Sequence, residues 1–113
     1  MTIDELIPAF NERIVFSYDN YKKIPPVPGC YVITNFQSEI LYIGQSVNLQ
    51  KRFCQHLDNN EKTKIGGYGR PTYFYFLACN VERLNKLESS LLQQYELKHG
   101  ALPVWNKVNA PTT

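Results

Sequence analysis

The sequence predicts a single α+β domain, and three features of the chain support this prediction. Two short stretches rich in β-branched and aromatic residues are separated by a turn, and a third, strongly aromatic stretch follows later. Two other segments repeat apolar residues at helical spacing. A chain of 113 residues, 43% of them hydrophobic, can bury a core of its own. We therefore assign residues 1–113 to one domain.

The segment 1–27 is predicted to form a short helix and a proline-rich lead-in. Thr2 and Glu5 have the spacing of a capping box, and apolar residues at helical spacing continue to Phe10. The later prolines of this segment lack amide donors and favour extended backbone. They therefore lead into a strand rather than a second helix.

The first two strands are predicted as a hairpin. Residues 29–34 and 39–44 have strand composition, and 35–38 has the composition of a turn. Because side chains alternate along a strand, Tyr31 and Tyr42 emerge on the same side if the apolar faces align. By the same alternation, two residues of one strand share a face in each of these sets: Cys30 and Val32, Tyr31 and Ile33, Leu41 and Ile43, and Ile40 and Tyr42.

A helix is predicted from the N-cap Asn48 to about Leu57. Arg52 and His56 are four residues apart, so they lie one turn apart on one side of this helix and can reach the same cleft. The apolar stripe beside them recurs every fourth residue, at Leu49, Phe53 and Leu57.

A third strand is predicted over 72–79, and a long helix runs from its cap Asn80 to about His99, where Gly100 is a stop signal. Helical projection places Glu88 near the middle of the apolar arc of this helix. A buried carboxylate needs a partner, either a basic side chain in an ion pair or a hard divalent cation. The arc consists of Val81, Leu84, Leu87, Leu91, Leu92 and Tyr95.

The net charge of the whole chain is only +2, but the stretch 45–70 alone has five basic residues against two acidic ones. A focused basic patch suits a polyanion, and an ordinary solvated helix and loop is the alternative. The basic side chains of this stretch belong to Lys51, Arg52, Lys62, Lys64 and Arg70.

Cys30, Cys54 and Cys79 form no CxxC pair and are interpreted as reduced core residues. The chain contains neither a secretory signal pattern nor an apolar run of about 18 residues, the length that a membrane span needs. These features predict a protein that is cytoplasmic or nucleoid-associated, and neither secreted nor bound to a membrane.

Taken as a spaced series, the reactive residues resemble the motifs of GIY-YIG nuclease domains, a family that includes nucleotide-excision repair endonucleases. The resemblance covers about 28–107, with 108–113 expected to fray, and implies a small central three-stranded antiparallel sheet surrounded by helices. It also implies a DNA repair-type endonuclease that hydrolyses DNA with Mg²⁺ or Mn²⁺. The matching residues are Gly29-Cys30-Tyr31, Tyr42-Ile43-Gly44, Arg52, His56, Glu88 and Asn106.

The resemblance also assigns roles at the site. Glu88 resembles the single metal ligand, Tyr31 the general base toward water, and Arg52 the group that stabilises phosphate charge. His56 and Tyr42 resemble residues that orient the nucleophile or the phosphate, and Asn106 resembles an asparagine that supports the site. Cysteine replaces isoleucine in the first motif, and Gln45 stands where many relatives carry lysine or threonine.

Two other functions compete with this hypothesis. The basic stretch and Gln45 would suit a nucleic-acid-binding module that keeps the nuclease scaffold without turnover. A protein-interaction domain would pair Glu88 with Arg52 only to hold the core together. For the endonuclease, Lys51, Lys62, Lys64 and Arg70 are candidate DNA contacts, and a protein partner could supply specificity. The sequence leaves the oligomeric state open.

Overall fold

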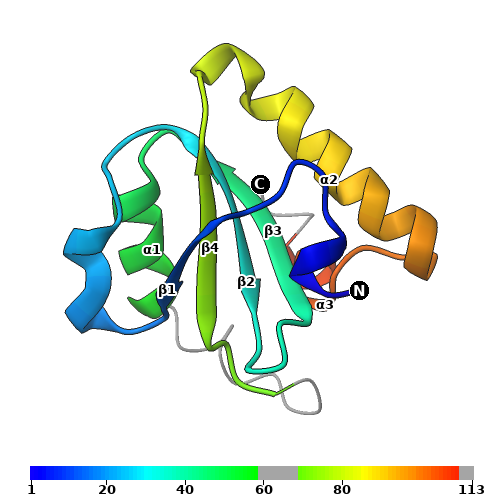
Figure 1. The fold of residues 1–113 in the computed structure, drawn as a ribbon, viewed down its shortest axis with the longest axis horizontal. Coiled ribbons are helices and arrows are strands. Elements are labelled where there is room, and N and C mark those ends of the chain that lie inside the picture. The colour runs from blue at the N-terminus through cyan, green and yellow to red at the C-terminus, as the bar shows by residue number, and fades with distance from the viewer. Residues whose placement is uncertain (59–68, 110–113) are drawn as a thin grey trace.

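The computed structural model describes residues 1–58 and 69–109, and its centre is an antiparallel sheet of four strands in the order β1-β4-β2-β3 (Figure 1). The strands are β1 (Glu12–Val15), β2 (Gly29–Thr34), β3 (Ile40–Ser46) and β4 (Tyr73–Ala78). The predicted α+β class is confirmed, but the prediction of three strands is wrong, because β1 adds a fourth strand beside β4.

Strand β1 lies in the segment for which only a helix and a lead-in were predicted. Its residues pair with β4 from Glu12 opposite Phe76 to Val15 opposite Tyr73, and most of its side chains are exposed. The Arg13 guanidinium lies 4.1 Å from the centroid of the Tyr73 ring, where a cation–π contact adds to the backbone pairing. This edge strand therefore depends on its neighbour more than on an apolar pattern of its own.

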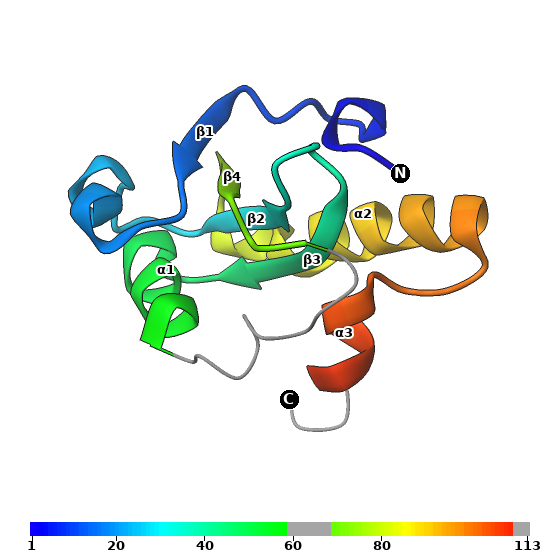
Figure 2. The same ribbon diagram turned by 90° about the horizontal axis from the view of Figure 1, so that it is seen from below.

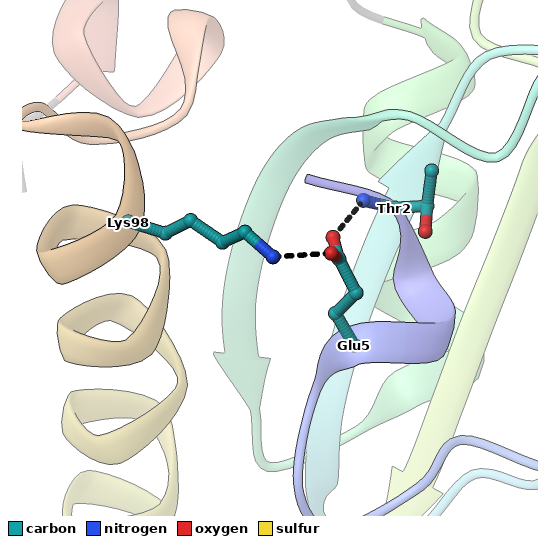
Figure 3. A network of polar contacts seen from close by, with 3 residues as sticks. All are labelled: Thr2, Glu5 and Lys98. Carbon is teal, nitrogen blue, oxygen red and sulfur yellow. Dashed lines mark hydrogen bonds and ion pairs between the residues drawn. The ribbon is translucent and has the colours of Figure 1, made fainter.

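The predicted opening helix is only a single 3-10 turn, η1 (Ile3–Glu5). The Glu5 carboxylate accepts the backbone N–H of Thr2 at 2.8 Å and forms an ion pair with Lys98 of the last long helix (Figure 3). The turn ends because Leu6 is already extended. The predicted capping interaction between Thr2 and Glu5 is thus present, but no long helix follows it. Glu5 instead links the start of the chain to another helix through Lys98.

The hairpin of β2 and β3 contains a bulge that changes the predicted alternation. Ile33 pairs with Tyr42 and Thr34 pairs with Ile40, so Leu41 is an extra residue in β3. Leu41 consequently packs in the same cluster as Tyr31, while Ile40 packs with Ile43, which corrects the prediction for those positions. Tyr31 and Tyr42 still share a face, as predicted, with ring centroids 5.9 Å apart.

Helices cover both faces of the sheet, with α1 (Leu49–Asp58) and α2 (Leu84–His99) on opposite sides (Figures 1 and 2). Leu91 of α2 packs with the chain start, whereas Phe53 of α1 packs with Trp105 of the short helix α3 (Val104–Asn109). Two further 3-10 segments, η2 (Tyr18–Lys23) and η4 (Val81–Arg83), complete the described elements.

The long helix was predicted correctly at its end and incorrectly at its start. Gly100 adopts φ +75° and ψ +5°, the left-handed conformation expected of a glycine stop. The N-terminal part after Asn80 is the 3-10 turn η4, and Val81 is 57% exposed rather than part of the buried arc. No helix in the described part of the chain is long and apolar enough to cross a membrane.

Candidate active site

Two features orient helix α1 against the sheet: an N-cap that fixes where the helix begins, and a stripe of apolar residues that is buried against the strands. The Asn48 side chain accepts the backbone N–H of Lys51 at 3.0 Å, which is the predicted N-cap. Leu49 and Phe53 are fully buried against the sheet. His56, one turn after Arg52, packs against the sheet, and only 3% of its surface is exposed.

Tyr31, Tyr42 and His56 form one aromatic cluster. The Tyr31 hydroxyl and His56 Nε2 are hydrogen-bonded at 2.7 Å in a buried position. The His56 ring lies edge-on to both tyrosines, with centroid distances of 5.3 Å to Tyr31 and 5.2 Å to Tyr42. Residues from two strands and one helix therefore meet at one place.

Gly44 of the second motif makes room for this cluster. A Cβ atom at position 44 would lie 2.6 Å from both Cζ and the hydroxyl oxygen of Tyr31, and 2.8 Å from the Tyr42 ring. Those distances are far below van der Waals contact, so any side chain at this position would displace the phenol. Steric fit, rather than backbone flexibility, explains this glycine.

Arg52 acts electrostatically on both tyrosines. Burial raises the pKa of Tyr31 well above its usual value, and Tyr42 raises it further, while the charge and hydrogen bond of Arg52 lower it. Burial also raises the pKa of Tyr42, against which the hydrogen bond from Tyr31 and the charge of Arg52 act. The Arg52 guanidinium thus offsets part of the rise in pKa that burial imposes on both hydroxyls.

Glu88 lies at the edge of the apolar face and is half-buried, not enclosed among leucines as the projection suggested. Its Oε1 accepts a hydrogen bond from Gln45 Nε2 at 3.0 Å, and the same nitrogen donates to Asn85 Oδ1 at 2.7 Å. Its negative charge contributes to raising the pKa of Tyr42, which places it within electrostatic range of the cluster. Asn85 was not identified from the sequence, although its spacing from Glu88 puts both on one helical face.

Glu88 does not pair with Arg52. Within residues 1–58 and 69–109, the ion pair found joins Lys98 to Glu5, and neither residue belongs to the site. The protein-interaction hypothesis required a structural ion pair between Glu88 and Arg52, and that pair is contradicted. The carboxylate instead has an amide as its partner.

Asn106 holds the backbone of β3 beside the second motif. Its Oδ1 accepts the N–H of Ile43 at 2.9 Å and its Nδ2 donates to the Ile43 carbonyl at 2.8 Å. Strand β3 is at an edge of the sheet, so these backbone groups have no strand on that side. Asn106 therefore fixes the strand between Tyr42 and Gly44.

The candidate DNA contacts are only partly covered by the structure. Lys51 and Arg70 are exposed, as a contact to a polyanion requires. Lys62 and Lys64 lie outside the described residues. Exposure is thus described at two of the four candidate contacts, and all four stay predictions.

The residues at this site fit a hard divalent cation. In the described residues there is no group of three or more His, Cys, Asp or Glu side chains that could enclose a metal. Mg²⁺ does not need such a group, because it keeps several waters and is commonly held by one or two carboxylates. The Glu88 carboxylate, which forms no ion pair with a basic side chain of residues 1–58 or 69–109, would be its ligand here.

Comparison with known proteins finds a matching family model and several relatives. The family model for the GIY-YIG catalytic domain matches residues 27–99. UvrABC system protein C of Aster yellows witches'-broom phytoplasma (strain AYWB) is 31% identical over 83 residues, which are 72% of this chain and 14% of that protein. The protein of the same name from Hydrogenobaculum sp. (strain Y04AAS1) is 42% identical over 85 residues, or 72% of this chain and 15% of that protein. The chain thus spans only a small part of these relatives.

Solved structures show the same fold. The GIY-YIG N-terminal endonuclease domain of UvrC from Thermotoga maritima, bound to its catalytic divalent cation magnesium, superimposes with a TM-score of 0.59. The two chains are 24% identical, and the match covers 78% of this chain and 92% of that one. A point mutant of that domain gives a TM-score of 0.58 at 25% identity, covering 80% and 97%.

Proposed function

Because the chain belongs to the GIY-YIG catalytic-domain family, we propose that it is an endonuclease that hydrolyses DNA phosphodiester bonds with a divalent cation, Mg²⁺ or Mn²⁺. The observation that supports this most directly is the buried hydrogen bond between Tyr31 and His56, next to the Arg52 guanidinium. A buried phenol that contacts both a proton acceptor and a cation suits proton transfer better than packing alone.

Tyr31 and His56 would manage the proton of the attacking water. Burial keeps Tyr31 protonated when it acts alone, so its proton must first move to His56 Nε2. Arg52 stabilises the phenolate that remains, and this phenolate removes a proton from water as the water oxygen bonds to phosphorus. The bond from phosphorus to the leaving oxygen breaks with its electron pair on that oxygen, which takes a proton from solvent, while His56 returns its proton to solvent and Tyr31 keeps the one taken from water.

Arg52 and Glu88 would compensate the charge of the phosphate. Arg52 contributes a fixed positive charge beside the phenol, where negative charge develops on the phosphate oxygens. Glu88 would hold the divalent cation, which when bound supplies Lewis-acid stabilisation of the phosphate and the leaving oxygen. Asn106 would keep Tyr42 and Gly44 in place through the Ile43 backbone.

Strand scission tests this proposal. Purified protein is incubated with supercoiled plasmid, nicked DNA and branched DNA in Mg²⁺, with and without a chelator. We expect scission that the chelator abolishes. In Glu88→Gln the rate of scission should fall by at least about 100-fold, because charge stabilisation at the reacting phosphate is lost. Glu82→Gln is the matched control, since Glu82 is an exposed acid in η4.

Absence of activity would reject the proposal, and a binding measurement would then identify the alternative. Folded wild-type protein that is as inert as Glu88→Gln on every substrate would show that the chain has no such activity. If that inert protein binds DNA with an affinity that falls steeply with salt, the nucleic-acid-binding module is the better description.

The setting of this activity is part of the proposal. The curated relatives are UvrABC system proteins that are much longer than this chain, so we propose a role in DNA repair with a separate module or protein partner supplying specificity. A cytoplasmic or nucleoid-associated location follows from such a substrate. Co-purification from cells and fractionation with DNA would test both.

A further inference from the structure

An exposed aromatic side chain lies in the turn between β2 and β3. Phe36 is 75% exposed, although the turn that carries it is held in place. The buried Asn35 side chain accepts the backbone N–H groups of Gln37 and Glu39, each at 3.0 Å, and its Nδ2 donates to Glu39 Oε1 at 2.9 Å. Because the turn is already ordered, binding through the exposed ring costs little further conformational entropy.

The turn lies at the same end of the sheet as the start of β4 (Figure 1). The ring centroids of Phe36 and the half-buried Tyr73 are 6.4 Å apart in a stacked arrangement. The exposed Arg13 has its guanidinium over the Tyr73 ring. A pocket of about 560 Å³ lies beside the turn, and both Phe36 and Arg70 line it. We call Phe36, Tyr73, Arg13 and Arg70 the aromatic surface.

The aromatic surface combines stacking groups with positive charge. Thr72 Oγ1 donates to the Arg70 carbonyl at 3.1 Å, which fixes the backbone beside the turn. Among the described residues of the surface and its pocket, two guanidinium groups stand against one carboxylate, that of Glu39. Proteins bind single-stranded DNA with this combination, because cations contact the phosphates while bases stack on aromatic rings. A base within a duplex is covered by its stacked neighbours, so an exposed ring suits an unpaired base.

We infer that the aromatic surface binds single-stranded DNA, with an unpaired base stacked on Phe36 and its phosphates beside the two arginines. The inference rests on the proposed function and names its substrate class, DNA with an unpaired segment near the bond that is cut. Tyr73 pairs with Thr34, three residues along β2 from Tyr31, so the surface begins roughly 10 Å along the sheet from the candidate site at about 3.3 Å per residue. One DNA strand can therefore contact both places.

Binding of a labelled oligothymidine of about 12 nucleotides, a length typical of single-strand sites, tests the inference in a chelator. We expect Phe36→Ala to bind it about 5- to 100-fold more weakly, the effect of losing one stacked base, and to bind a duplex of the same length like wild type. Arg70→Gln should lower the slope of log affinity against log salt by about 0.7. Leu97→Ala removes another exposed apolar side chain and should keep wild-type affinity.

Phe36→Trp adds a direct signal, because the single tryptophan of the chain, Trp105, is buried. Oligothymidine should quench the added fluorescence, and the duplex should not. If wild type does not bind oligothymidine, or if Phe36→Ala binds it equally well, the inference is wrong while the proposed function stands. Self-association of wild type that Phe36→Ala abolishes, with no effect on DNA affinity, would make the surface a protein interface and also overturn the inference. Binding that depends on Phe36 without scission of any DNA would remove the proposed function and leave the binding surface.

Discussion

The two faces of the sheet use neighbouring residues of one strand but bury different kinds of side chain. Toward α2, β2 buries Cys30 and Val32 in an apolar cluster with Leu91. Toward α1, it buries Tyr31, whose hydroxyl is bonded to His56. Burial is equally complete on both faces, so depth alone does not identify a functional residue. The difference is that the α1 face gives the Tyr31 hydroxyl a histidine as its partner, which can exchange a proton with it.

The largest expected effect comes from removing one oxygen atom on the α1 face. Tyr31→Phe should lower the rate of DNA scission by about 10²- to 10⁴-fold, the usual contribution of a general base, and change stability by only about 1 kcal/mol. Nicking rates and urea denaturation measure the two quantities. Tyr75→Phe removes the same atom from a buried tyrosine on the α2 face and should keep activity. Equal losses in both variants would refute the division between the faces.

The reverse result is expected on the α2 face. Leu91→Ala empties a fully buried position and should lower the free energy of unfolding by about 2–5 kcal/mol, while activity per folded molecule stays at the wild-type level. Urea denaturation combined with scission assays at low temperature tests this. Leu97→Ala, at a position 80% exposed on the same helix, should be neutral within about 0.5 kcal/mol. A selective loss of catalysis in Leu91→Ala would count against the comparison.

Gly44→Ala should affect both packing and chemistry, because the new methyl group would overlap the Tyr31 phenol. We expect a loss of about 1–3 kcal/mol from overpacking, together with a strong loss of scission. Gly100→Ala is the control: its positive φ makes alanine unfavourable by about 1–2 kcal/mol, but no atom lies within 4 Å of the added carbon. Retention of full activity by Gly44→Ala would show that the phenol position is not critical.

The smallest expected effect concerns Glu5, which ties the chain start to α2. The hydrogen bond from Lys98, then that from Thr2, lowers the pKa of Glu5 below its ordinary value of 4.5. A lowered pKa in the folded state means that the contribution to stability is present above about pH 4.5 and is lost as the pH falls through the folded pKa. The difference in melting temperature between wild type and Glu5→Gln should therefore be small at pH 7 and vanish in acid. Scission should not change, since the pair lies on the α2 face.

Local signals predicted much of the fold. Asn48 begins α1 and Gly100 ends α2 through interactions within a few residues of each position. Such helix ends can therefore be predicted from the local sequence alone. Strand β1 was missed because its pattern is mostly exposed and its partner β4 lies about 60 residues later. The bulge at Leu41 was missed because it arises from how two strands pair, not from either strand alone.

At the candidate site, the sequence indicated residue types and faces but not their partners. The shared face of Tyr31 and Tyr42 followed from alternation and is present. The helical projection of Glu88 could not show that Gln45 would donate to its carboxylate and to Asn85, because those two hydrogen bonds join β3 to α2. The catalytic roles of Tyr31, Tyr42, Arg52, His56, Glu88 and Asn106 remain predictions.

The two hydrogen bonds between Asn106 and the Ile43 backbone let the last helix shield the edge of strand β3 as well as fix the position of the second motif. A truncated chain without α3 would expose an unpaired strand edge and remove Trp105 from the core at the same time. Self-association and loss of the proposed DNA scission are then expected together. Light scattering and amide hydrogen exchange at Ile43 in such a truncation would reveal whether the two changes coincide.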